Sequence, residues 1–184
     1  GEFFVAQGDH EYTDKLLQTF QPAEVVFQKG RQADLGDHWV KKFYTYGLDP
    51  WIFDHRYAEE ALLRHFGTYS LKGYGIEDME EGIVAAGAVL HYLGDTVHPN
   101  TSHIASIHRI NRDEYLWMDQ FTIRNLELIY AGVDGGATLL KTIDSTVSPM
   151  GARLMRRWVL MPLVQKEQIE ERATLVAAIL ANRE

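Results

Sequence analysis

The sequence predicts an α/β unit followed by a mainly helical unit. Near the N-terminus, short apolar runs of strand type alternate with a segment of helical spacing, which is the order of an α/β arrangement. Toward the C-terminus, successive helical segments follow one another. The charge changes along the same line: residues 1–98 carry 16 acidic and 8 basic residues, and residues 99–184 carry 10 of each.

The first half contains apolar runs bounded by glycine, which predict strands, and segments with apolar residues three and four apart, which predict helices. The predicted elements are strands over residues 2–8 and 23–27 and helices over residues 12–20, 54–66 and 79–93. Gly67 and Gly94 stand where the last two helices would stop. Residues 31–49 follow no regular pattern.

The second half begins after a polar, proline-containing segment at residues 96–103, which is the predicted linker. It places the domain boundary between residues 98 and 99. Asp119 is the predicted N-cap of the first helix beyond it. The predicted elements are strands over residues 103–110 and 114–118, helices over residues 120–130, 138–144, 149–161 and 166–184, and a glycine-rich loop over residues 131–137.

The run SPMGARLMRRWVLMPL predicts a helix with clear ends. Ser148 is a good N-cap, Pro149 suits the first helical position, and Pro162 forces the chain out of the helix. Met150, Leu154, Trp158 and Met161 share one side, and Met155 and Val159 widen the apolar surface. A helix that is apolar over most of its circumference is expected to be surrounded by protein.

The remaining arc of this helix carries Arg153, Arg156 and Arg157, with Leu160 among them. Because a short connection follows, we expect the next helix to pack antiparallel to this one. That helix should bury Ile169, Ala173, Val176 and Leu180. Its first turns carry Glu167, Glu170 and Glu171, and our hypothesis is that the arginine arc meets these glutamates or an acidic neighbouring domain.

Several kinds of chemistry are not predicted. The chain has no cysteine, no serine elbow of the G-x-S-x-G type, and no complete phosphate-binding loop in either glycine cluster. The pairs His55–Glu59 and His91–Asp95 have helical spacing but lack a third metal ligand. Neither half is basic enough to grip phosphates by itself. We therefore predict no catalytic, cofactor-binding or metal-binding residue in this chain.

The location is predicted to be cytoplasmic. The apolar runs are shorter than the ~20 residues that a membrane helix needs, so no membrane contact is expected. The N-terminal residues also lack the pattern of a signal peptide.

Three motifs resemble the MutS family of DNA mismatch-repair proteins. TLLKTIDSTVSPMGARLMRRWVLMPL resembles the core-domain pattern TLL…D…T-x-P-M-G-x-R-L-L-R-x-W…P-L, and MDQFTIRNLEL resembles LD-x-x-T-x-x-NLEL. FGTYSLKGYGIEDMEEGIVAAGAVLHYL resembles the end of the family's connector domain. The resemblance marks structural or interdomain candidates, which are Asp119, Asn125, Pro149, Gly151, Arg153, Arg156, Arg157, Trp158 and Pro162.

The resemblance implies a ribonuclease-H-like connector domain over residues 1–98, followed by the first helices of the helical core, or lever, domain over residues 99–184. It also implies that the chain is a fragment, with strands missing before it and clamp helices continuing after Glu184. The fragment would have no enzyme activity, whereas the full-length family member would be a DNA-dependent ATPase that uses ATP and Mg²⁺. The implied partners are MutL and a second MutS subunit, with mismatched duplex DNA bound only by the full-length protein.

The sequence leaves other functions open. One is an autonomous protein-interaction module that acts through its acidic surface, and another is a MutS paralogue without a repair role. An active nuclease is disfavoured because the strand at residues 3–6 carries no carboxylate. From its charge, and because the resemblance implies that the mismatch-reading wedge and the clamp are missing, we expect the chain to bind duplex DNA weakly and with little preference for a mismatch.

Overall fold

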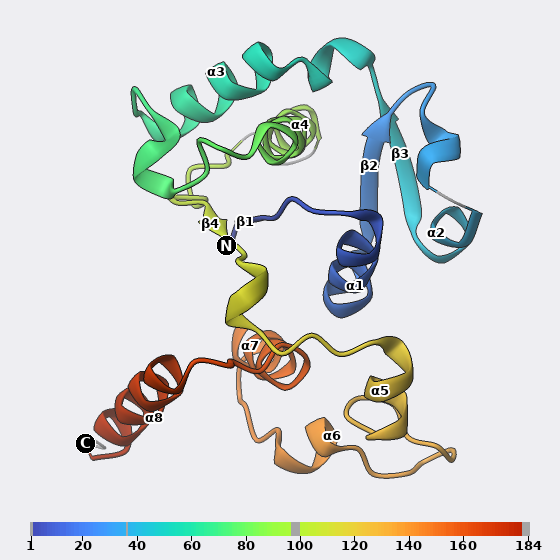
Figure 1. Ribbon diagram of the computed structural model, residues 1–184, viewed down its shortest axis with the longest axis vertical. Helices are drawn as coiled ribbons and strands as arrows, with labels where there is room; N and C mark the ends of the chain where they lie inside the picture. Colours follow the sequence, from blue (N-terminus) through green and yellow to red (C-terminus); the bar gives the residue numbers. More distant parts are fainter. Residues whose placement is uncertain (1, 36, 97–99, 182–184) are drawn as a thin grey trace. The chain divides into compact units, whose positions relative to one another are not determined.

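The computed structural model describes residues 2–35, 37–96 and 100–181, and the chain divides into two compact units. The first unit comprises residues 1–13 and 21–110, and the second comprises residues 14–20 and 111–184. Figure 1 traces the chain from the N-terminus in blue to the C-terminus in red. The predicted boundary between residues 98 and 99 lies outside the described residues.

The first unit contains the predicted strands and helices together with elements that the sequence did not predict. Its elements are β1 (Phe4–Val5), the start of α1 (His10–Phe20), β2 (Glu24–Gln28), the 3-10 helix η1 (Gln32–Leu35), α2 (Asp37–Lys42), β3 (Tyr44–Leu48), η2 (Pro50–Phe53), α3 (His55–Phe66), η3 (Leu71–Tyr74), α4 (Glu80–Asp95) and β4 (His108–Arg109). Helix α2 and strand β3 were missed, because a six-residue helix and a strand exposed at alternate positions give little periodic signal.

The strands pair in parallel over long distances in the sequence. β1 pairs with β4, with Phe4 opposite His108, and β2 pairs with β3, from Glu24 opposite Tyr44 to Gln28 opposite Leu48. Within the described residues these are two separate two-stranded sheets. The strand predicted over residues 103–110 is therefore confirmed only at its last part, where β4 forms.

Helix α3 has the ends that short-range chemistry dictates, whereas α4 begins after Met79 without a side-chain cap and gives one exception to the predicted helix ends. The Asp54 side chain accepts a hydrogen bond from the Tyr57 amide, and Gly67 closes α3 with the left-handed backbone that glycine tolerates. The exception is Gly94, which was predicted to stop α4 but lies within it, since the helix runs to Asp95.

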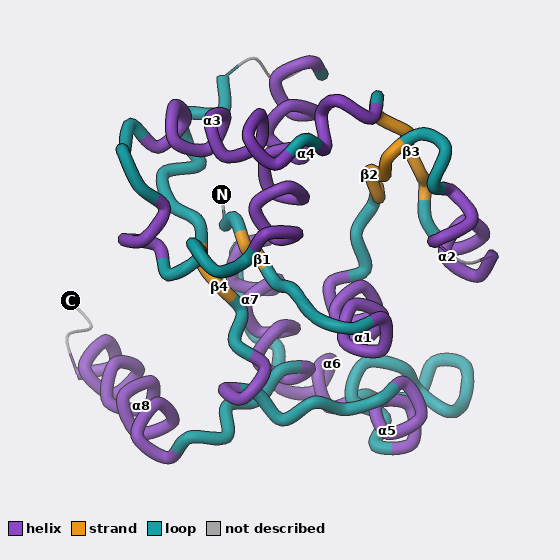
Figure 2. Tube along the Cα trace, turned by 45° about the horizontal axis from the view of Figure 1, so that its top comes forward, coloured by secondary structure: helices purple, strands orange, loops and turns teal. Residues whose placement is uncertain are grey.

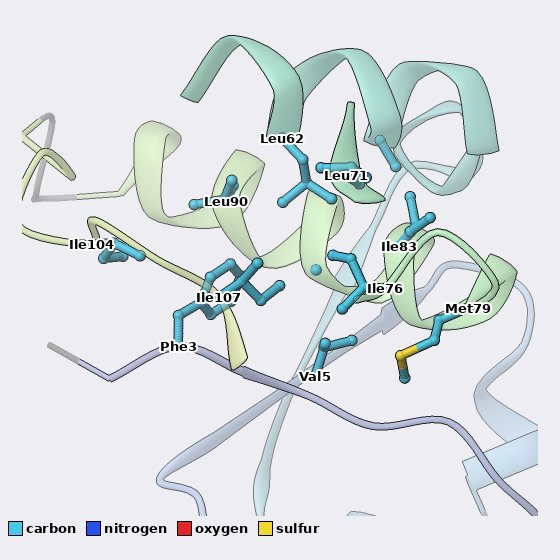
Figure 3. Packing of buried hydrophobic residues seen from close by; sticks show 12 residues of the cluster. Phe3, Val5, Leu62, Leu71, Ile76, Met79, Ile83, Leu90, Ile104 and Ile107 are labelled. Carbon is cyan, nitrogen blue, oxygen red and sulfur yellow. The ribbon is translucent and has the colours of Figure 1, made fainter. Parts of the chain in front are cut away.

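The core of the first unit lies between α3, α4, β1 and the segment before β4, as Figure 3 shows. Leu62 of α3, Ile83 of α4 and Ile107 are fully buried there. The two helices approach closely because α4 carries Gly87 at the crossing. A Cβ atom added at Gly87 would lie 2.5 Å from the Cα atom of Ala58. Glycine is therefore the residue that the α3–α4 crossing requires.

The second unit is mainly helical, so the order of α/β and then helical structure is confirmed. Besides the rest of α1, it contains η4 (Arg112–Glu114), α5 (Gln120–Asn125), α6 (Leu139–Ile143), α7 (Pro149–Leu160) and α8 (Lys166–Ala181). The last three correspond to the predicted helices, and residues 131–137 form the predicted loop. Figure 2 shows these helices in purple and the loops that join them in teal.

Helix α5 is shorter than the predicted helix over residues 120–130. It ends at Asn125, and Glu127 then adopts a positive φ of 48°. This turn brings the Leu128 amide back to the Ile123 carbonyl at 3.1 Å. The reversal lets Ile123 and Leu128 enter the same cluster of buried side chains, which a continuing helix would separate.

The strand predicted over residues 114–118 is also wrong. Arg112–Glu114 form η4, and Tyr115 makes one isolated antiparallel bridge, to Leu163. The Leu116 amide donates to the Pro162 carbonyl at 2.8 Å, and the Val164 amide donates to the Glu114 carbonyl at 3.1 Å. The partner segment is too short to extend these bonds into a strand pair.

Candidate interaction surfaces

Helix α7 is fixed at both ends by the residues that the sequence indicated. The Ser148 hydroxyl accepts a hydrogen bond from the Gly151 amide at 3.1 Å, and Pro149 occupies the first helical position. The helix ends at Leu160, after which Met161 leaves the helical conformation and Pro162 follows. The predicted caps of this helix are confirmed.

The buried side of α7 agrees with the prediction only in part, since Met161 is buried as expected but two other residues are not where they were expected. Leu160, which was expected among the arginines, is only 2% exposed and packs with Ile123 and Leu128. Met150, which was expected on the covered side, is 72% exposed. Arg156 and Arg157 are half-buried and Arg153 is exposed. The helix therefore turns its C-terminal end, and not its whole apolar side, into the core of the second unit.

Asp119 and Asn125 mark the two ends of α5. The Asp119 side chain accepts a hydrogen bond from the Thr122 amide at 2.7 Å, which confirms it as the N-cap. Hydrogen bonds from Thr122 hold the pKa of the Asp119 carboxyl below its usual value. Asn125 is the exposed last residue of the helix.

Helices α7 and α8 do not pack along their lengths as predicted. In both views α8 runs away from α7 toward the C-terminal end of the trace. The residues predicted to be buried on α8, Ile169, Ala173, Val176 and Leu180, are all exposed. The segment between the helices is hydrogen-bonded to residues 114–116, which fixes where α8 begins. One side-chain contact between the helices places the Arg172 guanidinium 4.1 Å from the centre of the Trp158 ring.

Aromatic side chains gather where β3 and η2 meet α4, and all of them are exposed except Tyr92, which is half-buried. We define the aromatic surface by Tyr44, Tyr46, Trp51 and Tyr92. Tyr44 is 64% exposed and Trp51 is 54% exposed. The Tyr46 ring lies 5.4 Å from the Tyr92 ring, and the Trp51 ring lies 5.3 Å from that of His91, the residue beside Tyr92 on α4. Exposed tyrosine and tryptophan are enriched at protein interfaces.

Carboxylates accompany the aromatic surface. The Tyr92 hydroxyl donates to the Glu24 carboxylate at 2.6 Å, and this bond raises the pKa of Tyr92 to about 12. His91 lies 3.1 Å from the Asp95 carboxylate through Nε2 and 2.7 Å from the Tyr57 hydroxyl through Nδ1. Aromatic faces and carboxylates both attract cations, so the surface suits a positively charged partner.

The other end of α4 carries an open hollow with no obvious chemistry. It has a volume of about 460 Å³ and is lined by Phe53, His55, Glu80, Glu81, Val84 and Ala85. In the described part of the chain, no three histidine, aspartate or glutamate side chains come together in a way that could hold a metal ion. Likewise, no described helix is long and apolar enough to cross a membrane.

Sequence reasoning missed Arg172 and the aromatic surface. Tyr44 and Tyr46 alternate with Thr45 in a strand pattern that could have been noticed at residues 44–48. Arg172 gives no such signal, because it follows two glutamates and is therefore expected to be a charged residue exposed to solvent. Of the predicted residues, the structure brings Pro149 and Gly151 together at the start of α7 and places Trp158 against the missed Arg172.

Known proteins match this chain over both units. The family model described as MutS domain II matches residues 1–105, and the one described as MutS domain III matches residues 121–184. An α/β part that matches MutS domain II is thus followed by a helical part that matches MutS domain III, which defines the chain as a protein with MutS domains. The chain belongs to the MutS family.

Proteins named DNA mismatch repair protein MutS are similar over the whole chain. The one from Christiangramia forsetii is 50% identical over 184 residues, which is 100% of this chain and 21% of that protein. Those from Cytophaga hutchinsonii and Flavobacterium johnsoniae are 46% and 47% identical over the same 184 residues, which cover 22% and 21% of their lengths. The chain thus spans about a fifth of the length of these relatives.

Proposed function

We propose that this chain is the connector domain and the beginning of the core domain of a protein that repairs DNA mismatches. The observation that carries the proposal is the match to two MutS domains in order, with half identity to a mismatch repair protein over all 184 residues. In this proposal the connector occupies residues 1–98, has a ribonuclease-H-like fold and performs no chemistry. ATP, Mg²⁺, mismatched duplex DNA and a second subunit are bound by the larger protein.

The proposed role of the second unit is mechanical. A segment that transmits a conformational change between distant sites must resist bending, and α7 has the local features for this. Ser148 caps its first turn, and Leu160 anchors its last turn in the core. Just beyond the helix, the Pro162 carbonyl accepts a hydrogen bond from the Leu116 amide. We call this helix the α7 strut. The predicted residues Arg153, Arg156, Arg157 and Trp158 then act through packing and charge along it, and not by touching DNA.

The proposed role of the first unit includes contact with MutL through the aromatic surface. The acidic balance of residues 1–98 supports a basic partner, and Tyr44, Tyr46 and Trp51 supply the rigid aromatic area on which interface energies concentrate. The proposed contact lies at the junction of β3, η2 and α4.

The repair function is tested by exchange in a full-length relative. The matching segment of the Christiangramia forsetii protein is replaced by this chain, and mutation frequency is measured in cells that lack their own MutS. We expect the chimera to lower the mutation frequency to the level given by the unaltered relative. A chimera that is produced stably and binds mismatched DNA, yet leaves the mutation frequency at the level of the deletion, would contradict the proposal and favour a paralogue without a repair role.

The MutL contact is tested separately with Tyr46→Ser in the same chimera. Tyrosine is enriched among the few interface residues whose truncation costs about 2 kcal/mol or more, so we expect binding of MutL to weaken more than about tenfold. Tyr69→Ser is the matched control, since Tyr69 lies in the same unit and is fully exposed, away from the aromatic surface. Equal binding by both variants would remove the aromatic surface from the proposal.

A further inference from the structure

Helix α8 has an inverted pattern of burial. Its apolar residues Leu175, Val176 and Ile179 are exposed, and Ile179 is 72% exposed. The half-buried positions are Gln168 and Arg172, which lie one turn apart on one face. The helix is therefore held to the rest of its unit by polar side chains, while its apolar face is left open.

The backbone fixes where α8 begins but not where it points. Bonds from residues 114–116 hold Pro162 and Val164, and the first hydrogen bond of α8, from the Ile169 amide to the Gln165 carbonyl, follows at once. Beyond Gln165 the helix can swing about the few torsions that join it to this anchored segment. Its direction must then be set by side-chain contacts on its first three turns.

Arg172 makes the contact that meets this need. Its guanidinium lies 4.1 Å from the centre of the Trp158 ring, near the end of the α7 strut. An arginine at this distance over a tryptophan face is attracted by the ring electrons and also stacks on it. Because Trp158 is itself half-buried and belongs to a helix capped at both ends, it offers Arg172 a fixed platform.

The Arg172 guanidinium is partly buried and lies among other polar groups. Burial lowers the pKa of the Arg172 guanidinium, the Tyr115 side chain raises it, and the charge of Arg157 lowers it. Arginine nonetheless stays protonated at neutral pH. On the same face, the Gln168 Oε1 atom is buried and has no hydrogen-bond partner among the described residues. The face of α8 that meets the unit thus carries the contact of Arg172 with Trp158, and beside it a buried Gln168 oxygen without a hydrogen-bond partner among the described residues.

We propose that Arg172 is a positioning residue: by its contact with Trp158 it sets the direction in which α8 leaves the α7 strut. The direction of α8 decides where the apolar face carrying Leu175 and Ile179 is presented. This inference deepens the mechanical role proposed above and rests on it for the functional arm of the test, while the structural arm stands alone.

The structural arm uses the absence of cysteine from the sequence. Spin labels are attached to Met150→Cys on α7 and Ala177→Cys on α8, both at exposed positions, and the distances between them are measured by electron spin resonance. The background is compared with Arg172→Gln and with Trp158→Leu. Lys166→Gln is the control, because it also removes one positive charge from α8, at an exposed ion pair with Glu170.

In the unaltered background we expect one narrow distance distribution. A cation–π contact is worth ~0.5–2 kcal/mol, so loss of either partner should lower the ratio of positioned to displaced α8 by about 2- to 30-fold. The distribution should broaden in Arg172→Gln and in Trp158→Leu, and the double variant should add little to either. Arg172→Lys should restore part of the narrow distribution because it keeps the cation. Unchanged distributions in both single variants, or equal broadening in Lys166→Gln, would overturn the proposal.

The functional arm places Arg172→Gln in the full-length chimera. We expect the affinity for mismatched DNA without nucleotide to stay unchanged and the ATP-dependent release from DNA to slow, a difference that simple loss of folding would not produce. If the label distances broaden and the release rate does not change, Arg172 still positions α8 and the mechanical role of the strut is wrong. A chimera without repair activity even when Arg172 is present would instead count against the proposed function itself.

Discussion

Replacement of Gly87 by alanine should weaken the first unit where α3 crosses α4. The new Cβ atom would lie 2.5 Å from both the Cα and the Cβ atoms of Ala58, whereas ordinary contact begins at 3.4 Å. The helices would therefore have to separate by about 1 Å, since the Ala58 Cα atom belongs to the backbone and its Cβ atom is fixed to it, so neither can rotate away. Overpacking of this kind costs up to ~3 kcal/mol, and the higher helix propensity of alanine returns ~1 kcal/mol. We expect a net loss of about 2 kcal/mol.

The assay is urea unfolding followed by circular dichroism, together with hydrogen exchange of the amides of α4. The control is Gly94→Ala in the same helix, where none of the described residues comes within 4 Å of the added Cβ atom. That variant should be unchanged or more stable by up to ~1 kcal/mol. Adding Ala58→Gly to Gly87→Ala should recover part of the loss. Equal stability of the two alanine variants would refute the close-crossing argument.

Three further predictions concern single side chains. Leu160→Ala should lower the free energy of unfolding by about 2–5 kcal/mol because Leu160 is buried, whereas Val164→Ala, at an exposed position, should change it by less than ~0.5 kcal/mol in the same urea titration. Ser148→Ala should cost about 1 kcal/mol and speed exchange of the first amides of α7, and unaltered exchange would argue against the cap. Glu24→Gln should return the pKa of Tyr92 from about 12 toward 10.0 in a titration followed by nuclear magnetic resonance. Because the folded pKa is raised, this hydrogen bond stabilises the fold fully below pH 10 and is lost as the pH rises toward 12, so a Tyr92 pKa that does not move would contradict the assignment.

The features that could be predicted from the sequence are those decided by near neighbours in the chain. Asp54, Asp119 and Ser148 each bond to an amide three residues ahead, so their spacing alone identifies helix starts. The family was also recognisable, because the run ending at Pro162 is long and specific. Helical spacing identified α4 and α8 for the same reason, since a helix repeats its contacts every turn.

The features that could not be predicted depend on residues far apart in the chain. The end of α5 follows from the packing of Leu128 against Leu160, and the place where α8 begins follows from the hydrogen bond between Glu114 and Val164. Apolar spacing correctly predicted that α8 has an apolar face. It wrongly predicted that this face is buried, because spacing does not show which residues pack against it. Arg172 was missed since its partner, Trp158, belongs to another helix.

The parallel pairing of β1 with β4 has a consequence for how the protein is made. Phe4 lies opposite His108, so β1 must wait for nearly the whole of the first unit to be synthesised before its partner strand is available. Closing so long a loop is slow, and a waiting strand edge can pair wrongly. The segment from Asn100 to Ile110 therefore acts as the closing piece of the unit, and translation that pauses before it would leave a nascent chain that depends on chaperones.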